Sequence, residues 1–110
     1  MRAGIPLAGA SDAPVVPPSP WVRIAAARAR RTAAGATLGA AERLGAGAAL
    51  RLFTTGAAFA LGADRLGTLA PGGPADLVVV EPDPLRAPPD EVADARVRLT
   101  LVAGERVWPA

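Results

Sequence analysis

The chain of 110 residues has room for one small domain with a thin core, because half of its residues are hydrophobic but only 4% are aromatic. All twelve basic residues are arginines, and the absence of Cys and His excludes disulfides, Cys-rich zinc sites and imidazole acid–base catalysis within the chain. A formal net charge of +2 favours neither nucleic acid nor an anionic membrane as a partner.

The first predicted element is a strand over residues 3–12, an uncharged apolar run that ends in Ser11-Asp12. Such a run is typical of a strand buried on both faces of a parallel sheet, and it needs neighbouring strands to satisfy its backbone groups. Parallel α/β folds place ligands and catalytic groups where strands end, which makes Asp12 the first candidate site residue. The alternative is that Asp12 only caps a turn before Pro14.

A Pro-rich loop leads to a helix predicted over residues 21–34, with Ser19 as its cap and Gly35 as its end. The apolar positions of this segment share one face, but Arg28 stands beside them. A second helix is predicted over residues 47–61 from apolar spacings of three and four, and Gly56 is expected to kink it.

Two hairpins are predicted in the C-terminal half. The first pairs residues 67–69 with the β-branched run 76–80 across a Pro- and Gly-rich turn, and the second pairs 97–102 with 107–108. Residues 81–90 hold four prolines and predict an irregular surface connection. Asp76 at a strand entrance and Trp108 on the last strand are interpreted as a structural residue and a packing residue.

Four motifs in this order resemble the C-terminal part of the metal-dependent amidohydrolase superfamily, in its branch called amidohydrolase family 3. They occupy residues 7–15, 50–62 without position 55, 67–72 with 75–80, and 102–108. The fold class that the resemblance implies is α/β plus β. Residues 1–65 would form the eighth strand and following helices of a (β/α)₈ TIM-type barrel, and residues 66–110 the C-terminal strands of a small β-sandwich.

The resemblance also implies hydrolysis of carbon–nitrogen bonds in amide-type small molecules, by metal-activated water in the complete enzyme. Asp12 matches the family's metal-binding carboxylate, which also accepts a proton from the water, and Ser11 lies next to it. The expected cofactor is a divalent metal, zinc first. His and Lys are absent, however, and one carboxylate does not hold a catalytic zinc, so this chain alone is expected to be inactive.

The leading hypothesis is therefore a fragment of a hydrolase whose partner is the missing N-terminal barrel portion. A second hypothesis is a non-catalytic Arg-rich binding module, suggested by Arg23, Arg28, Arg30 and Arg31. A third is a stand-alone piece that completes a barrel with a separately encoded chain. No signal peptide and no apolar run of about 20 residues is visible, so a cytoplasmic location without a membrane partner is expected.

Overall fold

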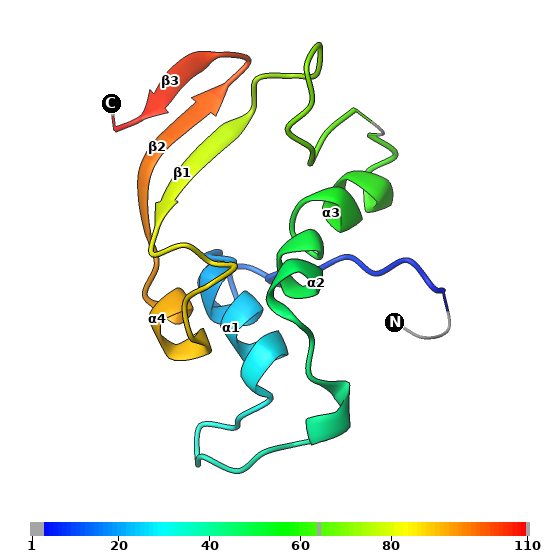
Figure 1. Ribbon diagram of the computed structural model, residues 1–110, viewed down its shortest axis with the longest axis vertical. Coiled ribbons are helices and arrows are strands. Elements are labelled where there is room, and N and C mark those ends of the chain that lie inside the picture. Colours follow the sequence, from blue (N-terminus) through cyan, green and yellow to red (C-terminus); the bar gives the residue numbers. More distant parts are fainter. Residues whose placement is uncertain (1–3, 64, 110) are drawn as a thin grey trace.

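The computed structural model describes residues 4–63 and 65–109, which form short helices and one three-stranded sheet (Figure 1). The elements are α1 (Trp21–Ala29), η1 (Ala40–Glu42), α2 (Ala46–Arg51), α3 (Thr55–Ala60), β1 (Leu77–Glu81), α4 (Pro89–Ala93), β2 (Arg96–Val102) and β3 (Glu105–Trp108). The strands are antiparallel in the order β1-β2-β3, with β2 in the centre. Helix α1 lies between α4 and α2, below the sheet in the view of Figure 1.

The core is small and centres on α1. Trp21 and Ile24 project from one face of this helix and are 8% and 1% exposed, in contact with buried residues of α2, of α4 and of the loop before α4. Those partners are Ala49, Val92 and Ala87. Two of the five buried side chains in this cluster are therefore alanines, which bury little apolar area, as the aromatic-poor composition predicts.

Hydrogen bonds to a neighbouring loop account for the position of Arg28 beside the apolar face of α1. Its guanidinium donates hydrogen bonds to the carbonyl oxygens of Pro84 (3.2 Å) and Ala87 (2.9 Å), in the loop that leads into α4. These carbonyls have no strand or helix partner there, and a planar guanidinium can serve both at once. Arg28 thus fastens α1 to a loop 56 residues further along the chain.

The predicted helix over residues 21–34 is too long, because α1 ends at Ala29. Arg30 adopts a left-handed conformation (φ 55°), and its N–H bonds to the carbonyl of Ala26, which closes the helix five residues before Gly35. The cap prediction for Ser19 is also wrong. No side chain caps α1, and the Ser19 carbonyl instead accepts a bond of 2.6 Å from Arg23.

The second predicted helix, over residues 47–61, is divided into α2 and α3. The break lies at Thr54 (φ −120°, ψ −98°), not at Gly56, which is inside α3. Gly67 packs directly against the broken turn: a Cβ added to it would lie 2.6 Å from the carbonyl oxygen of Thr54. The division thus coincides with a tertiary contact, and helical periodicity does not report such contacts.

The second hairpin is confirmed, with β2 and β3 joined by Ala103-Gly104, both at positive φ (51° and 84°) as a tight primed turn requires. The first hairpin is wrong. Residues 67–69 form no strand, and β1 pairs with β2 in the register Leu77 to Leu101. A three-residue run competes poorly with the seven alternating residues of β2, which offer a full ladder of hydrogen bonds.

Two further expectations need correction. Residues 81–90 are not wholly irregular, because α4 begins at Pro89, where a proline suits the first turn, and Ala87 is buried in the core. Residues 4–12 form no strand and are mostly exposed; Ala3, the first residue of the predicted strand, lies outside the described residues. Neighbouring strands that would pair with this segment are absent from the described residues, so it runs as extended chain.

The described residues form neither a barrel nor a sandwich. The accessible surface is 7729 Å², whereas compact monomers of 11.0 kDa expose about 5,600 Å². The radius of gyration is 14.6 Å, against about 13 Å for a compact domain of this length. Much of the surplus is apolar, since half-exposed or more exposed side chains include Ile5, Phe59, Leu61, Val78, Val79 and Trp108. The predicted boundary between a barrel part at residues 1–65 and a sandwich part at residues 66–110 stays a prediction. The core takes side chains from both parts.

The burial of Ile24 gives a stability test with a control on the same helix. We expect Ile24→Ala to lower the free energy of unfolding by about 2–5 kcal/mol, because it removes apolar contacts and leaves a cavity between α1 and α4. Val22→Ala, at a side chain that is 55% exposed, should change it by less than about 0.5 kcal/mol. Urea unfolding followed by far-UV circular dichroism measures both, and equal losses would contradict the assigned core.

Candidate functional site

Asp12 lies at the end of an extended segment that crosses the α2–α3 region. Among the described residues, the main chain of residues 4–10 makes one hydrogen bond, from Gly9 N to the carbonyl oxygen of Leu52 (2.8 Å). Asp12 is exposed and has a left-handed backbone (φ 57°), which Asp tolerates better than most residues. Its carbonyl accepts a bond from Val15 N (3.0 Å), so Asp12 starts the turn that the alternative interpretation predicts. Its carboxylate stays open to solvent.

Two glycines let the extended segment approach the helices. A Cβ at Gly9 would lie 2.6 Å from Cζ of Phe53, so any larger residue there would require the ring to move. A Cβ at Gly56 would overlap the carbonyl oxygen of Leu7 and lie 2.9 Å from that of Arg51. These close contacts, together with the Gly9–Leu52 bond, fix the path of the chain that leads to Asp12.

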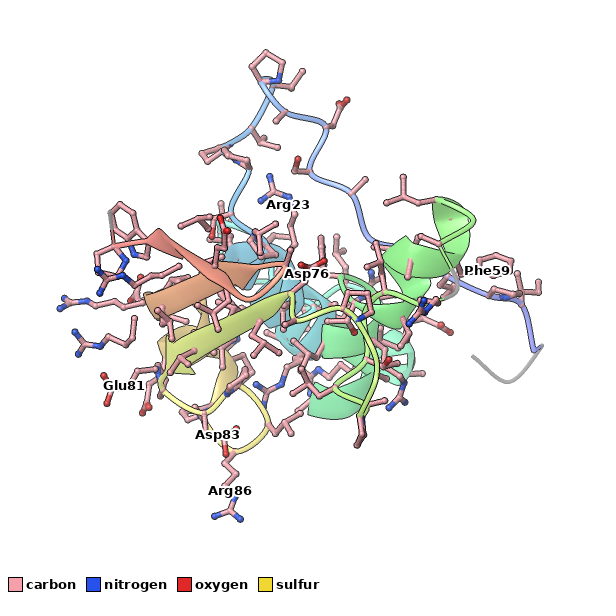
Figure 2. The ribbon with its side chains drawn as sticks, turned by 90° about the horizontal axis from the view of Figure 1, so that it is seen from above. Arg23, Phe59, Asp76, Glu81, Asp83 and Arg86 are labelled. Atoms are coloured by element: carbon pink, nitrogen blue, oxygen red, sulfur yellow. The ribbon has the colours of Figure 1, made fainter. Side chains whose placement is uncertain are left out.

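Arg23 supports the segment on the other side of Asp12, and sequence reasoning did not assign it this role. Its guanidinium donates to the carbonyl oxygens of Ser11 (3.3 Å) and Ser19 (2.6 Å), and so ties both ends of the Pro-rich loop to α1. Figure 2 shows Arg23 reaching from α1 into the space below this loop. Ser11 Oγ accepts a bond from Ala13 N (3.3 Å) and lies within the same turn.

The acidic residues are dispersed, and they form no metal site in the part of the chain that the structure describes. No group of three or more His, Cys, Asp or Glu there could hold an ion. Asp76 accepts a bond of 2.8 Å from Ala103 N and so braces the β2–β3 turn, in line with its structural interpretation. Glu81 pairs with Arg98 at 2.6 Å across β1 and β2. Asp83 lies 3.6 Å from Arg86 in the loop after β1, where Figure 2 labels both residues.

The arginines behind the binding-module hypothesis face different partners. Arg23 and Arg28 are occupied by carbonyl groups of two separate loops, and Arg30 donates to the Leu38 carbonyl at 3.0 Å. Arg31 lies 3.7 Å from Asp90. A continuous nucleic-acid surface needs cations aligned on one face, interleaved with aromatic groups. These four side chains do not provide it.

An apolar cleft lies beside the sheet, and Asp12 is not among its lining residues. It has a volume of about 290 Å³ and lies between β1 and the α1–α2 pair. Its walls are mainly apolar side chains, including Trp21, Leu50, Leu77 and Val80. Asp76 and Asp83 are its two carboxylates, and both already have hydrogen-bond partners. Each of these hydrogen bonds braces the main chain near the cleft, and Asp12 remains the candidate site residue.

Comparison with known proteins decides the family. A family model described as "Amidohydrolase family" matches residues 1–108. The chain belongs to the amidohydrolase family. Searches among curated proteins and among solved structures gave no significant match. The family match covers the extended segment, the helices and the sheet of this amidohydrolase chain alike, so the four motifs identified in the sequence belong to a single relationship. No helix in the described part of the chain is long and apolar enough to cross a membrane.

Two helical glycines provide a matched test of the segment that carries Asp12. Gly56→Ala should lower the free energy of unfolding by more than about 1 kcal/mol, because the new Cβ displaces the Leu7 main chain and outweighs the better helix propensity of alanine. In Gly47→Ala, within α2, the new Cβ would contact only the flexible end of Arg51 at 3.5 Å. This variant should therefore raise the free energy of unfolding by up to about 1 kcal/mol. Thermal unfolding compares the two variants. A stabilising Gly56→Ala substitution would show that the segment does not pack there.

Proposed function

We propose that this chain is the C-terminal part of a metal-dependent amidohydrolase that hydrolyses carbon–nitrogen bonds of amide-type small molecules, and that Asp12 supplies one carboxylate to its metal site. The observation that carries the proposal is the position of Asp12 within a chain matched by the family model. Its exposed carboxylate ends an extended segment with an almost unpaired main chain. That arrangement suits a residue whose partners belong to another part of a protein.

The residues present do not fit a catalytic metal by themselves. Catalytic zinc sites use three protein ligands as a rule, and no group of three or more His, Cys, Asp or Glu is brought together among the described residues. We therefore assign no catalytic step to this chain alone. In the proposed enzyme Asp12 would be an oxygen ligand, held in place by the turn at residues 11–15 and by the Arg23 bond to Ser11. The remaining ligands would come from polypeptide outside these residues.

The uncovered surface supports the same proposal. The main-chain groups at the edges of the extended segment can hydrogen-bond to water. Its apolar side chains Ile5 and Leu7, however, are 65% and 45% exposed. Phe59 and Leu61 are exposed at the end of α3, which packs on this segment. Adjacent strands and helices of a barrel would cover such a surface, and would pair both edges of the segment.

The first test is the intact mass of the native product, measured by mass spectrometry. The proposal predicts a polypeptide much larger than 11.0 kDa that includes His and Lys residues, since Asp12 alone cannot hold the metal. A native product of 11.0 kDa would contradict the fragment proposal and leave family membership intact.

The second test concerns Asp12 in that larger product. Asp12→Asn should lower kcat/KM for amide-type substrates by at least about 100-fold and reduce the bound zinc measured by atomic absorption, because an amide is a poorer ligand than a carboxylate. Asp94→Asn is the control, since Asp94 is an exposed carboxylate at the end of α4. An Asp12→Asn enzyme with unchanged metal content and turnover would exclude Asp12 from the site.

A further inference from the structure

Three arginines surround a small hollow at the C-terminal end of α1. The hollow has a volume of about 180 Å³ and is lined by Arg28, Ala29, Arg31, Arg43, Pro89 and Asp90. It lies where α1 meets the loop of residues 30–45 and the beginning of α4, two regions that Figure 1 shows beside the lower end of α1. Arg43 is 15 positions from Arg28 in the sequence, so only the folded loop brings this third guanidinium to the others.

Two of the three guanidiniums are held in place by the fold. Arg28 is anchored to the Pro84 and Ala87 carbonyls. Arg43 donates from Nε to the carbonyl oxygen of Ala29 (3.1 Å), and its Nη2 lies 3.4 Å from Thr37 Oγ1. Charged groups that are already ordered lose little conformational entropy when a ligand binds. The hollow therefore has preset positive charge on two sides.

The positive charge is greater than the end of α1 needs. Backbone carbonyls at a helix C-terminus attract cations, but three of those at the end of α1 already accept hydrogen bonds. Their donors are Arg30 N to Ala26, Leu44 N to Ala27 and Arg43 Nε to Ala29. The carboxylate in the lining, Asp90, is 84% exposed and lies 3.7 Å from Arg31 Nη1, too far for a hydrogen bond. Three cations thus line the hollow beside a single carboxylate, which is paired with Arg31 without a hydrogen bond.

We propose that this hollow binds a small oxyanion of the phosphate class, with Arg31 as the ligand-responsive side chain. A phosphate group offers several acceptor oxygens, and the forked donors of arginine match them in geometry and charge. Arg31 is 59% exposed and its only ion-pair partner among the described residues is Asp90, so its guanidinium can turn toward a bound anion. The site is separate from Asp12 and does not rest on the proposed hydrolase function.

The test is isothermal titration calorimetry of the full 110-residue chain with inorganic phosphate, at ionic strength held constant with potassium chloride. Arg31→Gln should weaken binding by about 10-fold, the loss expected for one charge-assisted hydrogen bond. Asp90→Asn should strengthen it by about threefold, because it removes the one nearby negative charge. Glycerol phosphate is titrated alongside, and the tighter ligand shows whether a free or an esterified phosphate is preferred.

The controls are Arg106→Gln and Asp94→Asn, which change the same charges at exposed positions outside the hollow, and neither should alter the affinity. Arg31 and Asp90 anchor no main-chain group, so both variants should keep the far-UV spectrum of the parent. Equal weakening by Arg31→Gln and Arg106→Gln would show diffuse charge attraction and overturn the proposal. An Asp90→Asn variant with unchanged affinity, or no heat above that of chloride, would overturn it too.

Discussion

Burial of one face of α1 is the interaction on which the rest of the structure depends. Ile24 and Trp21 contact α2, α4 and the loop before α4, and β1 and β2 reach the same cluster through Val80 and Val97. Without this face, helices of five or six residues would have no stability of their own, because isolated helices of that length do not form in water. The Arg28 bonds add a polar constraint across the same contact.

A core this small leaves much of the chain uncovered. The sheet, the end of α3 and the extended segment at residues 4–8 all present apolar side chains to water. The chain exposes about 2,100 Å² more than a compact monomer of its mass. This exposed apolar surface is the feature of the amidohydrolase chain on which the proposal of a larger enzyme rests.

The differences between sequence and structure share a physical cause. Residues 3–12 have the composition of a buried strand, but a strand exists only when neighbours pair with its main chain, and the described residues supply none. Residues 47–61 keep helical spacing throughout, yet the structure divides them into α2 and α3 where Gly67 packs against Thr54. The prolines of residues 81–90 predicted an irregular connection, but α4 begins at one of them, Pro89. Proline breaks a helix in its interior and is favoured in its first turn, so its presence alone does not distinguish the two cases.

The sequence by itself determined the family and made Asp12 a candidate site residue, because both depend on local motifs. It also determined the pairing of β2 with β3, because the alternation of apolar and polar side chains marks strands and can be read from the sequence. The absence of His and Cys also removes the nitrogen and sulfur ligands that zinc prefers, so only carboxylates such as Asp12 are left as candidate ligands. Only the tertiary structure decided the roles of Arg23, Arg28 and Arg43. Each of these guanidiniums bonds to carbonyls whose partnership is set by how the loops fold back on α1, and long-range contacts of this kind leave no periodic signal in the chain.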